Sequence, residues 1–282
     1  MRRRQVVSAA AGGVTLAALG VAGCAMLPRQ AVVPMPVTRL ASACPVPGGG
    51  PAPTLVVMLP GAYSLPVEFI DEGFVLALRE RGVQADVTIA DAHLGYFNDG
   101  SVLRRLRDDI VGPARRQGYA QVWLVGISLG GFGALGYASV HGREPGLGVD
   151  GVVALAPYLG SRRMQGEMVA AGGPAAWAAA LPPLGAGAGA GSTAASEAHP
   201  MEDAERALWR WLVAPPAGAP PVYLGYGVGD RLSDGHRLLA GQLPRERVFE
   251  VPGGHDWPPW RALWQQWLAR GLLPGGCTVT RP

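Results

Sequence analysis

Residues 121–131 read Gln-Val-Trp-Leu-Val-Gly-Ile-Ser-Leu-Gly-Gly, and this stretch decides the fold. Residues 121–127 are a nearly continuous apolar run, which is typical of a strand buried on both faces. Gly126, Ser128 and Gly130 then form the pattern Gly-x-Ser-x-Gly. In such a pattern a serine occupies a strained turn between a strand and a helix, and the glycines avoid collisions around it. The stretch therefore predicts that the hydroxyl of Ser128 projects above the end of a strand.

Further apolar runs of strand length lie on both sides of this stretch. They are found at residues 54–59, 85–90, 151–156, 221–225 and 247–251. The segments between them are long enough for helices, and several have an amphipathic pattern. Strands that alternate with helices form parallel sheets. The sequence thus predicts an α/β domain over residues 54–282, with a doubly wound, mainly parallel sheet of about six strands.

One segment interrupts the alternation. Residues 161–218 contain no strand pattern and are rich in Ala, Gly and Pro, although residues 201–213 have a helical pattern. This composition predicts an insertion that is partly helical and partly irregular. It is expected to form a lid over the carboxyl edge of the sheet, and a surface excursion without a role in binding is the alternative.

Ser128 can act as a nucleophile only if a base takes its proton and a third group orients that base. His255 follows the last expected strand, so it should lie at the same edge of the sheet as Ser128. Asp230 follows the strand before it and is expected to orient His255. Asp234 is the alternate acid, and a helix cap is the alternative role for Asp230.

The remaining histidines fit the role of the base less well. His93 follows the strand at 85–90 and is expected to line the substrate pocket or to be structural. His141 should end a helix at the surface, and His199 lies in the insertion. His236 lies early in a helix, where we expect it to be solvated.

Charge that develops on an attacked carbonyl needs preorganised donors. The backbone N–H of Leu129, directly after Ser128, is one expected donor. Gly61 permits a sharp bend after the strand at 54–59, which would turn the N–H of Ala62 or of Tyr63 toward the same point. We also expect the side chain of Tyr63 to contact the substrate.

The chain resembles the α/β-hydrolase fold family in the order Ser128, Asp230, His255, in the Gly126–Gly130 turn and in the Pro60-Gly61 loop. The resemblance covers about residues 54–272. It implies cleavage of esters, thioesters or related acyl bonds through an acyl-enzyme, without a cofactor, and it implies a carboxylesterase acting on a small-molecule ester. Family members usually have eight strands, so the first antiparallel hairpin is expected to be absent.

The same three residues could also serve an acyltransferase or a peptidase. A non-catalytic binding protein of the cell envelope that kept the fold is a further alternative, because one fold carries many functions.

Composition excludes several other classes. The positive side chains are all Arg and there is no Lys, so lysine-dependent chemistry is impossible. There are 24 arginines against 21 acidic residues, and three of the arginines lie at positions 2–4, so the rest of the chain is balanced. This balance argues against a nucleic-acid partner. Since no two histidines stand at ligand spacing, we expect no metal.

The first 24 residues have the pattern of an export signal. Three arginines precede an uncharged run at residues 6–23, and the run ends at Cys24. The ending Val21-Ala22-Gly23-Cys24 resembles the bacterial lipobox, which predicts a signal peptide at 1–23 and a lipid on Cys24. An uncleaved membrane anchor is the alternative. Either reading predicts a membrane-attached protein of the cell envelope, exposed to the periplasm or the exterior.

Two further features follow from this location. Residues 24–53 are rich in Pro and Gly, which predicts a tether between the membrane and the domain. Cys44 and Cys277 are the remaining cysteines, and in an oxidising compartment they are expected to form a disulfide. Two free thiols are the alternative.

Overall fold

The computed structural model of the protein describes residues 29–182, 200–275 and 277. The predicted signal peptide at 1–23, the lipidation at Cys24 and His199 lie outside the described residues. No helix within the described ranges is long and apolar enough to cross a membrane.

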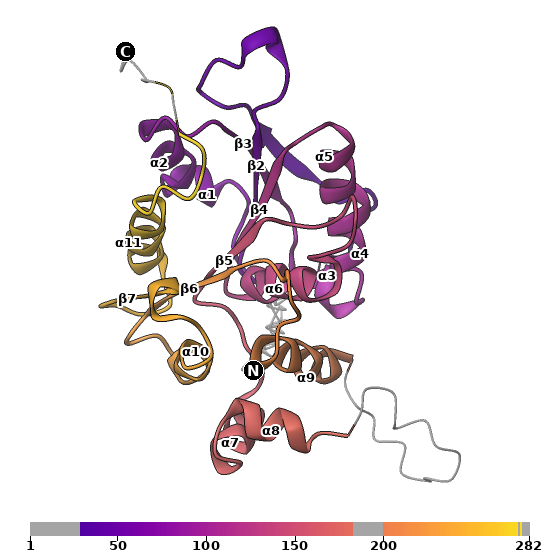
Figure 1. Ribbon diagram of the computed structural model, residues 1–282, viewed down its shortest axis with the longest axis vertical. Helices are drawn as coiled ribbons and strands as arrows, with labels where there is room; N and C mark the ends of the chain where they lie inside the picture. Colours follow the sequence, from indigo (N-terminus) through magenta and orange to yellow (C-terminus); the bar gives the residue numbers. More distant parts are fainter. Residues whose placement is uncertain (1–28, 183–199, 276, 278–282) are drawn as a thin grey trace, which may run out of the picture.

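A seven-stranded sheet with the order β1-β3-β2-β4-β5-β6-β7 forms the centre of the molecule (Figure 1). Its strands are β1 (Val37–Leu40), β2 (Thr54–Leu59), β3 (Ala85–Ala90), β4 (Gln121–Ile127), β5 (Gly151–Leu155), β6 (Val222–Gly227) and β7 (Val248–Val251). All neighbouring pairs are parallel except β1 with β3. The prediction of a mainly parallel α/β sheet is therefore confirmed.

The sheet has one strand more than the six that the sequence pattern located. β1 lies inside residues 24–53, which were predicted to be a tether, and it adds an antiparallel edge strand next to β3. Met35, Cys44 and Ala52 of the same segment are buried. β1 is only four residues long and its side chains are exposed or half-buried, so it has no continuous apolar run that could identify it in the sequence.

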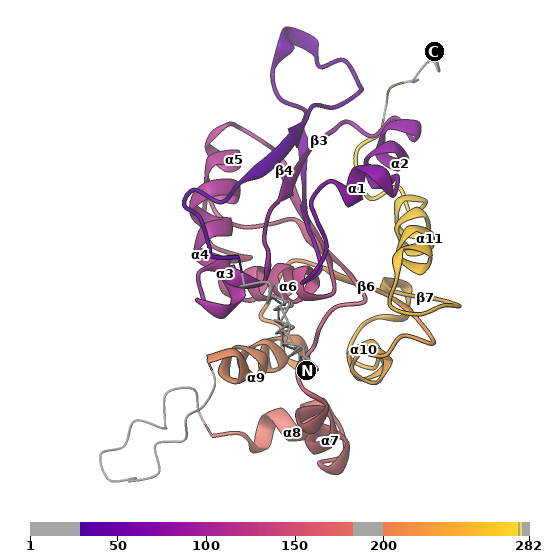
Figure 2. The ribbon, with the colours of Figure 1, turned by 180° about the vertical axis from the view of Figure 1, so that it is seen from behind.

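Helices cover both faces of the sheet, as Figures 1 and 2 show. On one face lie α3 (Leu94–Asn98), α4 (Val102–Arg105), a π-helical turn at Leu106–Val111, α5 (Gly112–Arg116) and α6 (Leu129–His141). The other face carries α1 (Glu68–Asp71), α2 (Phe74–Glu80) and α11 (Trp257–Leu268). Two short 3₁₀ turns, Pro47–Gly49 and Arg245–Arg247, lie in connections, and α10 (Ser233–Ala240) follows β6.

Three helices occupy the segment predicted as an insertion. They are α7 (Arg162–Ala170), α8 (Pro174–Ala180) and α9 (Pro200–Val213), and residues 183–199 between the last two lie outside the described residues. α9 packs against α6 through a buried apolar stripe that includes Leu208, Trp209 and Leu212. The indole of Trp209 donates a hydrogen bond to the carbonyl of Leu159 at 2.8 Å. α9 is therefore joined to the segment that follows β5.

A disulfide connects the two ends of the domain. Cys44 follows β1 and is bonded to Cys277, with the two Cα atoms 5.5 Å apart and a sequence separation of 233 residues. A crosslink that closes so long a loop restricts the unfolded chain strongly.

Candidate active site

Ser128 lies in a strained turn between β4 and α6. Its backbone has φ 53° and ψ −116°, and residues other than glycine rarely adopt a positive φ. A Cβ atom on Gly126 would lie 2.3 Å from the carbonyl oxygen of Gly130, and one on Gly130 would lie 2.2 Å from that of Leu59. Both glycines are thus required by close backbone contacts, which is the physical reason for the Gly-x-Ser-x-Gly pattern.

The structure brings Ser128, His255 and Asp230 into one hydrogen-bonded chain. His255 lies in the loop between β7 and α11, and its Nε2 is 2.9 Å from Oγ of Ser128. Its Nδ1 is 2.7 Å from Oδ2 of Asp230, which follows β6. Because parallel strands end at one edge of the sheet, three loops far apart in sequence meet there. The ring of Trp260 packs edge-on against His255, with centroids 5.1 Å apart, and holds its plane.

The environment of Asp230 keeps its carboxylate charged. Its side chain is fully buried. Burial raises the pKa of Asp230, but the hydrogen bonds from His255 and from the N–H of Leu232 outweigh it and hold the pKa below its usual value. One carboxylate oxygen thus holds the local turn, by accepting from Leu232 at 2.7 Å, while the other holds His255.

The alternate acid points away from His255. The side chain of Asp234 is 84% exposed and pairs with Arg237 on the same helix. Asp230, and not Asp234, therefore contacts the imidazole.

The loop after β2 passes directly beside Ser128. A Cβ on Gly61 would lie 3.5 Å from Cβ of Ser128, and Ala62 is the next residue of this loop. Leu129 is the first residue of α6, where backbone N–H groups have no partner within the helix and the helix dipole favours negative charge. The two predicted donors therefore belong to segments that flank Ser128. The side chain of Tyr63 is 91% exposed at the rim of this site.

His93 has a structural role in addition to any contact with substrate. It is the N-cap of α3, and its Nδ1 accepts a hydrogen bond from the N–H of Gly95 at 3.1 Å. Its ring packs against Tyr96, and it is buried. Burial and the nearby Arg29 lower the pKa of His93. Contact with substrate remains a prediction for this residue.

The prediction that His236 is solvated was wrong. His236, a residue of α10, is fully buried. Its ring lies 5.1 Å from that of Tyr226, and its Nε2 is 2.9 Å from the carbonyl oxygen of Pro157. This carbonyl requires the proton on Nε2, and the buried Nδ1 has no hydrogen-bond partner among the described residues. Burial lowers the pKa of His236 to about 4. The sequence did contain a signal for this burial. His236 lies three residues before the apolar Leu239, so the two share one face of the helix, and Leu239 is also buried.

His236 should make the stability of the fold depend on pH. Its pKa is lower in the folded chain than in the unfolded chain, so the unfolded state binds more protons between pH 6.5 and 4. Going from pH 7.5 to pH 5.0 is expected to lower the free energy of unfolding by about 2 kcal/mol through this residue. Urea unfolding at both pH values measures the change.

The His236→Gln variant is the control, and it should lose this part of the pH dependence. Glu205 remains in both proteins and acts in the opposite direction, because burial raises its pKa. Equal pH dependence in wild type and variant would contradict the assignment to His236.

A further pair, which the sequence did not predict, joins the turn at Ser128 to α9. The N–H of Tyr158 donates to the carbonyl of Ser128 at 2.9 Å, and its hydroxyl donates to Glu205 at 2.6 Å. Glu205 is 3% exposed and the Tyr158 ring packs against Phe132 of α6. The two partners are 47 residues apart in sequence, and no local pattern predicts their contact.

Within the described ranges, no three His, Cys, Asp or Glu side chains are grouped so that they could hold a metal ion.

No protein-family model matches the chain, and no curated protein matches it in sequence. Its structure is similar to that of an S-formylglutathione hydrolase from Staphylococcus aureus, with a TM-score of 0.51 and 15% identity over 78% of this chain and 81% of the other. It is also similar to the fluorophosphonate-binding serine hydrolase F of the same organism, with a TM-score of 0.51 and 15% identity over 84% of this chain and 91% of the other. A third similar structure is that of esterase LipW from Mycobacterium marinum, with a TM-score of 0.51 and 17% identity over 85% of this chain and 78% of the other. Together with the strand order and the turn at Ser128, these similarities show that the chain has the α/β-hydrolase fold.

Proposed function

We propose that the protein is a serine hydrolase that cleaves carboxylic esters through an acyl-enzyme. The observation that carries the proposal is the continuous contact from Asp230 through His255 to Ser128, at 2.7 and 2.9 Å. The strained turn at Ser128 supports it, because it exposes the hydroxyl at the start of a helix. Several solved structures with the same fold are those of esterases and serine hydrolases, which also supports the proposal.

In the proposed mechanism each of these residues has a role in acylation. Oγ of Ser128 attacks the ester carbonyl while Nε2 of His255 takes its proton. Asp230 accepts the hydrogen bond from Nδ1 and stabilises the imidazolium that forms. The N–H groups of Leu129 and Ala62 bind the oxyanion of the tetrahedral intermediate.

The remaining steps use the same groups. The intermediate collapses when the bond to the alcohol breaks, and His255 returns its proton to the leaving oxygen. A water molecule, deprotonated by His255, then attacks the acyl-enzyme. The acid is released and Ser128 regains its proton.

The location belongs to the proposal as well. Export through the signal at 1–23 and lipidation of Cys24 would attach the hydrolase to a membrane of the cell envelope. The Cys44–Cys277 disulfide supports an oxidising compartment, because such crosslinks are rare in the cytosol. A water-soluble carboxylic ester of small or moderate size is the simplest substrate for an initial assay.

Covalent labelling tests the proposed function. The protein is incubated with a fluorophosphonate, digested and analysed by mass spectrometry, while hydrolysis of p-nitrophenyl acetate is measured in parallel. We expect one adduct, on the peptide that contains Ser128, and loss of turnover in proportion to labelling. Absence of both turnover and adduct would favour the non-catalytic binding protein, and turnover that survives complete labelling would place the chemistry at another residue.

A further inference from the structure

The chain enters the domain at the edge of the sheet where Ser128 lies. In the antiparallel pair of β1 and β3, Val37 stands opposite Ala90, the last residue of β3. The residues before Val37 therefore continue past the carboxyl end of β3. The loop after β2 and the turn after β4 lie at this same edge, because these strands are parallel to β3. Residues 29–36, called the entry strap here, thus approach the domain from the side of the candidate active site.

Specific contacts fix the position of the entry strap. Arg29 forms an ion pair with Asp91, in which Nη1 is 3.0 Å from Oδ1. Val32 exchanges two hydrogen bonds with the hydroxyl of Tyr96 on α3: its N–H donates at 3.0 Å and its carbonyl accepts at 2.9 Å. These contacts hold both ends of the segment from residue 29 to residue 32 against the loop and helix that follow β3.

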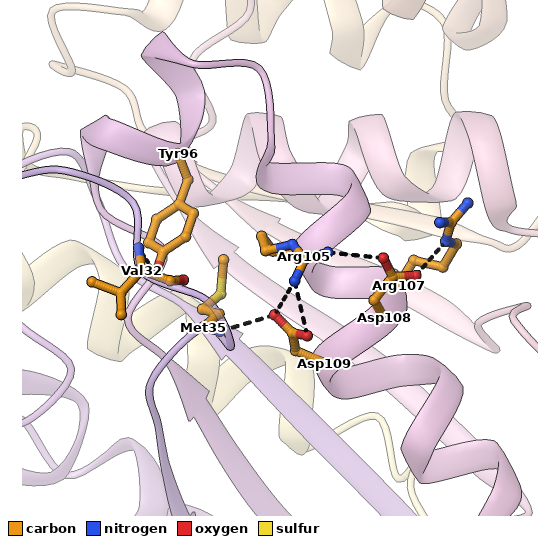
Figure 3. A network of polar contacts seen from close by, with 7 residues as sticks. All are labelled: Val32, Met35, Tyr96, Arg105, Arg107, Asp108 and Asp109. Atoms are coloured by element: carbon orange, nitrogen blue, oxygen red, sulfur yellow. Dashed lines mark hydrogen bonds and ion pairs between the residues drawn. The ribbon is translucent and has the colours of Figure 1, made fainter.

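A third contact fastens the strap just before β1, as Figure 3 shows. The N–H of Met35 donates to Asp109 at 2.9 Å. Asp109 is held in turn by the nearly buried Arg105, whose Nη1 lies 3.2 Å from both carboxylate oxygens. These contacts therefore fix the direction in which the chain enters the domain.

Apolar side chains are exposed on this edge. Val32 and Val33 of the strap are 54% and 68% exposed. In the loop that follows β2, the exposed apolar residues are Tyr63 at 91%, Leu65 at 55% and Val67 at 49%. The strap leads into β1 and this loop leaves β2, and these two strands lie on either side of β3, about 10 Å apart. The strap packs against α3 and the loop leads into α1, on opposite faces of the sheet, so these five residues stand on both sides of the carboxyl edge. They are called the docking rim here, and exposed apolar side chains around one edge can form a contact surface.

The sequence that precedes the strap carries the predicted membrane attachment. Cys24 is five residues before Arg29, and the uncharged run at 6–23 comes directly before it. Five extended residues span at most about 18 Å. A domain of about 250 residues has a radius of gyration of about 18 Å. Attachment at or before Cys24 would therefore leave too little chain for the domain to turn its opposite edge toward the membrane.

We propose that the docking rim is a membrane-contact surface, which seats the domain on the lipid bilayer with the entrance to Ser128 facing the lipid. Resting on the proposed function, this orientation assigns the substrate class: an ester of an amphipathic lipid, taken from the leaflet on which the domain sits.

An environment-sensitive probe tests the orientation without using catalysis. The full chain carries Leu65→Cys, labelled with nitrobenzoxadiazole, and is reconstituted into vesicles of phosphatidylcholine and phosphatidylglycerol at a ratio of four to one. The matched control is Val140→Cys, since Val140 is 60% exposed and lies at the far end of α6. That position is about 18 Å along the helix from Ser128.

We expect a blue shift and quenching by spin-labelled lipid for the probe at 65 and neither for the probe at 140. Equal responses at the two positions would overturn the proposal. A blue shift at 65 that appears without vesicles and grows with protein concentration would also overturn it, in favour of a contact between two copies of the chain.

A second measurement separates the substrate class from the proposed function. The variant Val33→Ser, Leu65→Ser, Val67→Ser should hydrolyse p-nitrophenyl acetate within twofold of wild type. Its hydrolysis of dioleoylglycerol embedded in the same vesicles should fall at least tenfold. If both rates are unchanged, the rim does not serve lipid substrates and the substrate class is wrong. If the probe at 65 responds as expected but wild type hydrolyses neither ester, the proposed function fails while the membrane contact stands.

Discussion

Replacement of Ser128 by alanine is expected to lower kcat/KM for p-nitrophenyl acetate by roughly 10⁵-fold or more, because it removes the proposed nucleophile from a group of residues that act as a unit. Within the part of the chain that the structure describes, the hydroxyl in contact with Nε2 of His255 is that of Ser128, at 2.9 Å. The residual rate would come from the oxyanion donors and from binding alone. The loss is measured from initial rates at several ester concentrations, divided by the protein concentration of each variant.

The fold should survive this substitution. Alanine has to adopt the backbone of Ser128, with φ 53°, and Ala156 already adopts φ 46° in the same chain. Ser139→Ala is the matched control, since this serine lies on α6 and its Oγ donates only to the carbonyl of Gly136, at 2.8 Å. The control should retain its activity within twofold. A Ser128→Ala protein that keeps more than a tenth of the wild-type rate would contradict the assignment of the nucleophile.

The elements that the sequence predicted correctly are those with a local cause. β2 and β4 are buried along nearly their whole length, so their residues must be apolar and form continuous runs. Gly126 and Gly130 are fixed by backbone atoms less than 3 Å from where a Cβ would lie. His255 and Asp230 each come shortly after a strand, and the parallel sheet brings the ends of these strands together. For such residues the position along the chain determines the position in space.

Other features depend on contacts that no local pattern contains. β1 is stabilised by pairing with β3, and its own four residues are too few and too exposed to be recognised. The burial of His236 depends on the carbonyl of Pro157, 79 residues earlier in the chain. The contact of Glu205 with Tyr158 joins α9 to the nucleophile turn across another long separation. These positions become visible only when the tertiary structure is known.

The fully buried position of Asp230 leads to the second large expected effect. Asp230→Asn should lower kcat for p-nitrophenyl acetate by roughly 10⁴-fold, although the two side chains have nearly the same shape. The carboxylate accepts from Nδ1 of His255 and so keeps the proton off Nε2, where the base must be free to accept from Ser128. An asparagine amide can donate to Nδ1 instead, which leaves the proton on Nε2 and removes the base. The loss of the negative charge also leaves the imidazolium without its stabilising partner.

Asp234→Asn is the matched control, because its side chain is exposed and is bonded to Arg237 instead of to His255. We expect this variant to stay within twofold of wild type, both in turnover and in the rate of fluorophosphonate labelling. Asp230→Asn should slow the labelling of Ser128 by a factor similar to the loss in kcat, while the urea midpoint, a measure of folding, remains that of a folded protein. A purely structural role of Asp230 predicts a lower midpoint together with a normal labelling rate for the molecules that remain folded. The reverse ranking of the two variants would make Asp234 the orienting acid, and that outcome would require the loop after β6 to rearrange before catalysis.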